Sequence, residues 1–311
     1  MSYLHEINER FPIRKRREQK DEFLSWALQE AEKLGYRAKV EELGDKKQHR
    51  NLVVGNLNSA KTVFTAHYDT PANNVLPNIM MPRNIPLFLL YQIFVVCVLL
   101  IISFAAMALG AWIAPGTKLP MLLYLVVYFG LLMLLMRGPA NKHNANDNTS
   151  GVAAVFSLMA SLPTEERRKA AFILFDNEEK GKLGSKAYAK EHKETASLKL
   201  FINMDCVGVG DHILVLPRRM ARIHPLYERL EKAFHPGNGK QALFFSPFGT
   251  VCNSDHKNFE CGVAIVACKK APVVGYYAAR IHTSRDTVAD EANIAYLAEN
   301  LTAFVQSVDE E

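Results

Sequence analysis

The chain has 311 residues, of which 49% are apolar and 22% charged, and its formal net charge is +5. This length and apolar content suffice for a sizeable core, so disorder is not indicated. The basic residues form only small clusters, such as 14–17 and 167–169. Such clusters are typical of a solvated face, and we expect no nucleic-acid partner.

The cysteines and the N-terminus bear on the compartment. The chain has five cysteines, an odd number, and no pair has Cys-x-x-Cys spacing. A disulfide framework is therefore not expected, and a reducing compartment fits better. Residues 1–19 lack the apolar segment of a secretory signal peptide, so we expect none there.

The first elements lead to a candidate ligand pair. Apolar residues at helical spacing predict a helix over about 15–34, and strands are expected at 37–43, 51–57 and 61–66. The last of these strands ends at His67-Tyr68-Asp69. In extended chain His67 and Asp69 lie on one face, which would suit a metal-binding imidazole supported by a carboxylate. A His-x-Asp sequence also occurs by chance in many proteins.

Two long apolar runs follow. Neither 86–114 nor 119–136 contains a charged residue, and a turn at 115–118 separates them. A bilayer core about 30 Å thick is crossed by roughly 20 apolar residues in a helix. Tyr91 and Trp112 lie near the two ends of the first run, where interfacial aromatics are expected. We predict a transmembrane hairpin; the alternative is a helical hairpin buried in a large core or an oligomer interface.

The charges around the hairpin predict its orientation. Arg83, Arg137 and Lys142 flank its two ends, whereas Lys118 alone marks its tip. Under the positive-inside tendency the main domain faces the cytoplasm. We therefore expect an integral protein of a bacterial-type plasma membrane. Its main domain is expected to consist of residues 1–82 and 139–311, with the hairpin, 83–138, inserted between them.

The rest of the chain alternates strands and helices. Asp147 lies in a polar loop before a helix at 152–162, where a helix cap is the alternative role. A strand at 170–175 leads to Glu178-Glu179, and another at 198–204 leads to Asp205. Further helices are expected at 181–192, 223–234 and 290–308, and further strands at 213–216 and 263–267. The alternation predicts an α/β fold with a mixed central sheet and helices on both faces.

The candidate residues share one property. His67, Glu179 and Asp205 follow predicted strands, and Asp147 and His282 lie in loops before helices. Ligand sites of open α/β sheets gather at the carboxyl ends of the strands. Two imidazoles and three carboxylates suit a pair of Zn²⁺ ions. An isolated pair of adjacent glutamates would more often begin a solvated loop. Here Glu178 is the carboxylate that is not needed as a ligand, so it could accept and donate protons.

The order of these motifs is similar to that of a known family. His-x-Asp, Asp-Asn-x-Ser-Gly, Glu-Glu, Asp, and His-Thr followed by Asp-Thr resemble the M28 zinc peptidases, the aminopeptidase Y and leucyl aminopeptidase group. The resemblance covers roughly 1–80 and 140–311, and the Ser-Asp-His loop at 254–256 also looks like the family's. It implies a zinc-exopeptidase fold of the phosphorylase/hydrolase-like type, with the hairpin as an insertion.

The resemblance also implies an activity, the removal of N-terminal residues from peptide substrates with two Zn²⁺ ions. It implies these roles: His67 and Asp205 hold one zinc, Glu179 and His282 hold the other, Asp147 bridges them, Glu178 is the general base, and Asp69 supports His67. Ordinary members have only a loop where this chain has the hairpin. The hairpin is expected either to select peptides at or in the lipid bilayer or simply to anchor the protein.

Other activities remain open. Glutaminyl cyclases resemble the same fold but use one zinc, and the presence of His67, a ligand of the second metal, argues against that activity. Carboxypeptidase or dipeptidase action stays possible within the family. A catalytically inactive membrane scaffold is disfavoured because the set of ligands and Glu178 is complete. The sequence carries no signal for side-chain preference or oligomeric state.

Overall fold

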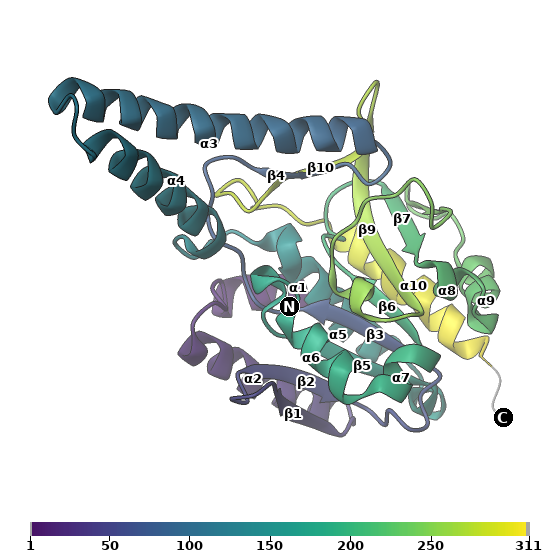
Figure 1. The fold of residues 1–311 in the computed structure, drawn as a ribbon. Coiled ribbons are helices and arrows are strands. Elements are labelled where there is room, and N and C mark those ends of the chain that lie inside the picture. Colours follow the sequence, from purple (N-terminus) through teal and green to yellow (C-terminus); the bar gives the residue numbers. More distant parts are fainter. Residues whose placement is uncertain (1, 309–311) are drawn as a thin grey trace.

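The computed structural model describes residues 2–308; Met1 and residues 309–311, the outer ends of the predicted main-domain segments, lie outside the described residues. It confirms the predicted α/β class. A ten-stranded mixed sheet runs in the order β1-β2-β5-β3-β6-β9-β10-β4, and β7 pairs with both β9 and β8. Helices cover both faces of this sheet, and one pair of helices projects away from it (Figure 1).

The strands are β1 (Ala38–Leu43), β2 (His49–Val54), β3 (Thr62–His67), β4 (Asn78–Met80), β5 (Ala170–Phe175), β6 (Leu200–Met204), β7 (His212–Pro217), β8 (Gln241–Phe244), β9 (Gly262–Ala271) and β10 (Gly275–Ile281). The α-helices are α1 (Tyr3–Arg10), α2 (Arg17–Lys33), α3 (Ile85–Ile113), α4 (Leu119–Arg137), α5 (Gly151–Ser161), α6 (Leu183–Glu191), α7 (Lys193–Leu198), α8 (Arg219–Arg222), α9 (Pro225–Ala233) and α10 (Glu291–Gln306). Shorter helical turns lie at Ala145–Ser150, Thr164–Lys169, Glu178–Lys180 and Asp255–Asn258.

The central strands are buried on both faces. In β5, Phe172 and Leu174 belong to one hydrophobic cluster, whereas Ile173 and Phe175 belong to another on the opposite face. This alternation follows from the two-residue period of a strand. The first cluster includes residues of α1, α2, α5, α9 and α10, and the second includes residues of α6 and α7. The continuous apolar run of β5 therefore separates two layers of helices.

Parallel pairing brings three strand ends together. β3 lies between β5 and β6 and runs parallel to both, with His67 opposite Phe175 in the register. Carboxyl ends of neighbouring parallel strands meet at one edge of a sheet. His67, the Glu178-Glu179 pair and Asp205 consequently share that edge.

Some predicted boundaries differ from the structure. β2 ends at Val54 rather than at 57 because Gly55 turns the chain with a φ of +87°. The helix expected at 223–234 begins two residues later, because α9 starts at Pro225, whose missing N–H needs no partner in the first turn of a helix. The sequence did not indicate α1, α7, β4, β8 or β10, which are short or lack a clear apolar period.

The two apolar helices, α3 and α4, form the projecting hairpin of Figure 1. In the most apolar 18-residue stretch of α3, only 17% is buried. In the corresponding stretch of α4, nothing is buried. The hairpin is therefore not a buried element of this chain's own core. Both helices are long and apolar enough to be candidate membrane spans, by length and composition.

The base of the hairpin is tied to the sheet. A guanidinium nitrogen of Arg83 donates to the carbonyls of Phe248 and Gly249, at 3.1 and 2.9 Å. The side-chain amide of Asn84 donates to the carbonyls of Val273 and Val274, between β9 and β10. β4, which precedes these residues, pairs with β10. One end of the hairpin thus adjoins the strand that leads to the candidate site.

Candidate metal centre

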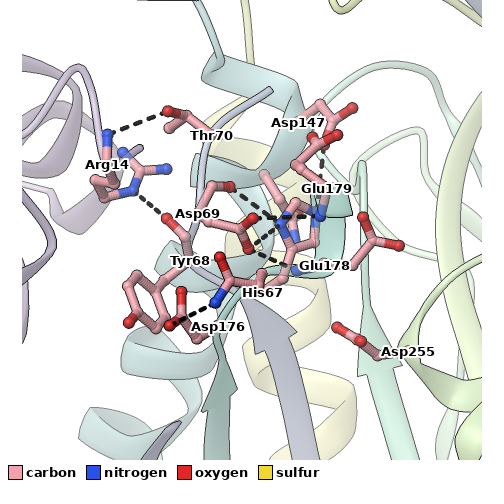
Figure 2. Close-up of polar contacts among 12 residues, drawn as sticks. Arg14, His67, Tyr68, Asp69, Thr70, Asp147, Asp176, Glu178, Glu179 and Asp255 are labelled. Atoms are coloured by element: carbon pink, nitrogen blue, oxygen red, sulfur yellow. Dashed lines mark hydrogen bonds and ion pairs between the residues drawn. The ribbon is translucent and has the colours of Figure 1, made fainter. Parts of the chain in front are cut away.

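The structure brings the five predicted ligand side chains together. Nε2 of His67, the last residue of β3, lies 3.4 Å from Oδ1 of Asp147 and 3.7 Å from Oδ1 of Asp205. His282 follows β10, and its Nε2 lies 3.1 Å from Oδ2 of Asp147. The same nitrogen is 3.4 Å from Oε2 of Glu179. The two oxygens of Asp147 therefore face different imidazoles, and Figure 2 shows Asp147 and Glu179 close to His67.

These side chains form two overlapping groups of donor atoms. His67, Asp147 and Asp205 offer donors that lie within 4.8 Å of one another, and so do Asp147, Glu179 and His282. Asp147 belongs to both groups. A third group joins His67 to Glu178 and Glu179. Imidazole nitrogens and carboxylate oxygens at this spacing can hold two cations that share one carboxylate.

A hydrogen-bonded loop positions Asp147. Three side chains of this loop accept hydrogen bonds from the backbone after β6: Asn148 from Cys206 at 3.1 Å, Ser150 from Val207 at 3.0 Å, and Asn146 from Gly208 at 2.8 Å. The peptide bond between Asp147 and Asn148 is cis. The three hydrogen bonds attach the segment carrying Asp147 to the segment that carries Asp205, which explains why the two candidate ligands lie together.

Asp286 holds the same loop from the other side. Its Oδ1 accepts from the backbone amide of Asn146 and its Oδ2 from that of Asp147, both at 3.0 Å. Burial, with the charge of Asp147, raises the pKa of Asp286 to about 7. The sequence assigned no role to Asp286, although it belongs to the Asp-Thr motif that follows His282.

Asp69 contacts His67 and the Glu178-Glu179 pair through different atoms. Its carboxylate accepts hydrogen bonds from the backbone amides of Glu178 at 2.9 Å and Glu179 at 3.2 Å. Nδ1 of His67 lies 3.1 Å from the backbone carbonyl of Asp69 and 3.6 Å from its carboxylate. The backbone of Asp69 therefore orients the imidazole, and its carboxylate orients the glutamate pair. The sequence predicted only support of His67.

The burial of Arg14 contradicts the prediction of a solvated basic cluster. The basic cluster 14–17 was expected to be solvated, yet Arg14 is fully buried. Its Nε donates to the carbonyl of Tyr68 at 2.5 Å, and its backbone amide donates to the hydroxyl of Thr70 at 3.1 Å (Figure 2). Its Nη2 donates to the side chains of Asn144 and Thr149. Buried acceptors near the end of β3 thus satisfy the guanidinium, which charge patterning along the chain did not reveal.

Burial and charge set the protonation of the cluster. Burial raises the pKa of Glu178 well above its usual range and that of Glu179 to about 8. Burial opposes the charged form of His282, but Glu179 and Asp147 raise its pKa to about 9. Burial also opposes the charge of Asp147, but His282 and His67 hold its pKa below the usual range. In the absence of a metal the cluster therefore retains protons at neutral pH.

The Ser-Asp-His loop lies against the same region. Asp255 is fully buried, accepts a hydrogen bond from the hydroxyl of Ser185, and has an Oδ2 without a partner among the described residues. Burial raises the pKa of Asp255 to about 7, and this carboxylate contributes to the raised pKa of Glu178. Burial also lowers the pKa of His256 to about 3, so its imidazole is neutral.

A cavity of about 260 Å³ opens above the cluster. Its walls contain ligand candidates together with Glu178, while Asn78 and Met80 of β4 form part of its rim. Lys182 also lines the cavity and donates to the side chain of Asn253 at 2.9 Å. The cavity is small, and the carboxylates and imidazoles of the candidate ligands form much of its lining.

Solved structures of other proteins share the fold of this chain. The LapA aminopeptidase of Legionella pneumophila is 14% identical, with a TM-score of 0.58 over 99% of this chain and 71% of that one. A Zn-dependent exopeptidase from Parabacteroides distasonis is 14% identical, with a TM-score of 0.59 over 98% and 96%. A glutaminyl cyclase from Bacteroides thetaiotaomicron is 14% identical, with a TM-score of 0.59 over 99% and 96%. These similarities show the fold.

The sequence comparisons identify the family. No curated protein matches the chain. The model of peptidase family M28 matches residues 133–305, more than half of the chain. This match includes four of the five predicted ligands and Glu178, and the first ligand, His67, lies before it. The chain belongs to peptidase family M28.

Proposed function

We propose that this protein is a membrane-anchored dinuclear zinc aminopeptidase with Glu178 as its general base. The observation that carries the proposal is the position of Asp147, whose two carboxylate oxygens face His67 and His282 in two separate donor groups. A carboxylate placed in this way can bridge two cations. We assign His67 and Asp205 to one Zn²⁺ ion, and Glu179 and His282 to the other.

The residues present fit this pair of ions. Oε1 of Glu179 is buried without a hydrogen-bond partner among the described residues, although the other oxygen faces His282. An unpaired buried carboxylate oxygen is costly, and a cation would remove that cost. When bound, zinc ions supply Lewis acidity, which polarises a carbonyl group and lowers the pKa of water.

Glu178 is suited to move the proton. Its carboxylate is near those of the ligands but receives no hydrogen bond from residues 2–308. Asp69 holds its backbone amide, so the side chain projects from a fixed position. Glu178 accepts a proton from the attacking water and donates it to the departing amine of the cleaved peptide bond.

Exopeptidase specificity follows from the cavity. Carboxylates of Asp147, Glu178 and Asp205 line a volume of about 260 Å³. The amine of a free amino terminus could bind a zinc ion held by these carboxylates, or pair with a carboxylate that no metal neutralises, while the acetylated terminus of an otherwise identical peptide can do neither. We therefore assign peptides with free amino termini as substrates.

The hairpin supplies the membrane anchor in this proposal. Its helices expose apolar side chains such as Leu90, Ile101 and Phe129, at 61%, 66% and 58% exposure. Leaving this surface in water would be unfavourable, whereas lipid would cover it. The basic residues at its two ends favour a catalytic domain that faces the cytoplasm.

Hydrolysis of a peptide panel tests the activity. The protein, purified in detergent with zinc, is assayed on peptides with free and acetylated amino termini, and on a peptide that begins with glutamine. We expect cleavage of free-terminus peptides only. Cyclisation of the glutamine peptide without cleavage of the others would instead establish a glutaminyl cyclase. Two of the structurally similar proteins are glutaminyl cyclases.

Glu178→Gln tests the general base. We expect this variant to keep the fold and bound zinc but to lose roughly 10²- to 10⁴-fold in rate, the usual contribution of such a group. Glu194→Gln, a matched change at an exposed position, should leave the rate unchanged. Near-wild-type turnover by Glu178→Gln would exclude Glu178 from the role.

A further inference from the structure

A second cavity lies where α4 ends, apart from the candidate metal centre. It has a volume of about 730 Å³ and is bounded by α4 on one side and residues 13–19 on the other. Gly138, Pro139 and Ala140, which follow α4, also line it. This groove is therefore formed between the membrane hairpin and the start of the catalytic domain.

One wall of the groove is apolar. Gly130, Met133, Leu134 and Arg137 line it from α4. Their spacing of three and four residues places them on one face of a helix. A Cβ atom added at Gly130 would meet no atom within 4 Å, so the groove remains open beside this glycine. The wall is apolar along its length and ends in a cation.

The opposite wall adds two more cations. Lys15 and Arg16 line the groove from residues 13–19. The ammonium of Lys15 donates to the carbonyl of Gly138 at 2.9 Å, which holds it beside the end of α4. Within residues 2–308, neither Arg16 nor Arg137 has a carboxylate within ion-pair distance. Three basic side chains thus line the apolar groove, and although Lys15 also feels the charges of Glu179 and Asp69, the two arginines have no carboxylate partner among residues 2–308.

We propose that this groove binds an anionic phospholipid. Its phosphate would lie among Lys15, Arg16 and Arg137, and an acyl chain would lie along Gly130, Met133 and Leu134. Charge complementarity favours this ligand: cytoplasmic leaflets carry anionic lipids, and juxtamembrane basic residues attract them. The proposal rests on the membrane anchoring described above, because that anchoring places the end of α4 at the level of the headgroups.

The groove lies close to the metal centre, so a bound lipid would affect how the catalytic domain is held at the membrane. Lys15 and Arg137 also line a neighbouring cavity of about 320 Å³ that reaches Asp69 and Glu179. Lys15 directly follows Arg14, which holds the backbone after β3. A lipid in the groove would therefore fix the catalytic domain against the bilayer surface, with the metal centre close to that surface.

Native mass spectrometry of the full-length protein in mild detergent tests the proposal. We expect phosphatidylglycerol to bind more tightly than phosphatidylcholine with the same acyl chains. One basic residue near an anionic membrane surface corresponds to roughly a fivefold change in binding. The double variant Arg16→Gln/Arg137→Gln should therefore bind phosphatidylglycerol roughly 25-fold more weakly. Gly130→Leu, which fills the groove from the apolar wall, should weaken binding with the cations intact.

A control variant and a competing ligand distinguish binding in this groove from nonspecific association with lipid. Lys118→Gln removes an exposed cation at the other end of the hairpin and should leave lipid binding unchanged. Glycerol 3-phosphate should not compete, because it lacks an acyl chain. Equal binding of the two lipids, wild-type binding by the double variant, or full competition by glycerol 3-phosphate would overturn the proposal. The measurement does not depend on hydrolysis, so a failure here is distinguishable from a failure of the proposed peptidase activity.

Discussion

Asp286 holds Asp147 through the backbone: its Oδ2 accepts a hydrogen bond from the amide of Asp147 at 3.0 Å. The carboxylate of Asp147 thereby remains directed at His67 and His282. Two buried carboxylates in one site thus have different tasks. One faces the proposed metals, and the other fixes the position of the first.

Asp286→Asn should weaken metal binding. An amide offers only one acceptor oxygen, so one of the amides of Asn146 and Asp147 would lose its partner. We expect zinc affinity to fall roughly 10- to 100-fold, as is usual when a group that orients a ligand is altered. Competition with a chromogenic chelator measures this affinity. Asp45→Asn, at an exposed position, is the control; equal affinities of the two variants would contradict a positioning role for Asp286.

Zinc binding to the metal-free protein should release protons. The pKa of His282 is raised to about 9 by Glu179 and Asp147 against the effect of burial, and burial raises the pKa of Glu179 to about 8. At pH 7.5 both groups hold protons, which they lose on becoming ligands. Affinity should therefore rise with pH, and the number of protons released should be smaller at pH 8.5 than at pH 7.5.

Calorimetry in buffers of different ionisation enthalpy measures this proton release. The apparent binding enthalpy at pH 7.5 should vary with the buffer, with a slope equal to the number of protons released. His282→Ala should reduce this slope because the imidazolium is absent. An enthalpy independent of the buffer would show that the free cluster is already deprotonated.

Arg14→Met should destabilise the protein. The variant fills a similar volume but leaves the carbonyl of Tyr68 and the side chains of Asn144 and Thr149 without a buried donor. Hydrogen bonds from a charged donor are each worth about 1.5–3 kcal/mol, so we expect a loss on the order of 3 kcal/mol. Thermal unfolding in detergent, compared with Arg219→Met at an exposed position, measures the effect. A melting temperature equal to that of the control would contradict this prediction.

Replacing Ile85–Arg137 with a flexible Gly/Ser linker should release the protein from membranes. The hairpin exposes most of its apolar surface, whereas the three hydrophobic clusters of the main domain lie outside it. Extraction of membranes with alkaline carbonate should leave the full-length protein in the pellet and the shortened protein in solution. Retention of the shortened protein would point to a membrane contact elsewhere.

The shortened protein also tests substrate selection. If the hairpin only anchors the protein, the ratio of rates on hydrophobic and polar peptides should stay the same. A ratio that shifts toward polar peptides would support a role of the hairpin in selecting peptides at the bilayer. Zinc content should be unchanged in either case, because no proposed ligand lies within the replaced segment.

The sequence alone predicted the features that depend on local periodicity. A run of apolar residues such as 170–175 indicates a buried strand, and an uncharged run such as 86–114 indicates a long apolar helix that is a candidate membrane span, because each depends only on consecutive residues. The order of short motifs was sufficient to indicate the family, which the comparison shows. It also placed His67 at the end of a strand and Glu179 shortly after one, as the structure has them.

Only the tertiary structure decided how distant segments meet. The pairing of β10 with β4 and β9 places His282 against Asp147, and no spacing along the chain encodes that register. The burial of Arg14 and the hydrogen bonds of Asp286 likewise depend on acceptors and donors from remote segments. Local sequence determines which conformation a segment favours, whereas the partner of a buried polar group is determined by which segments pack around it.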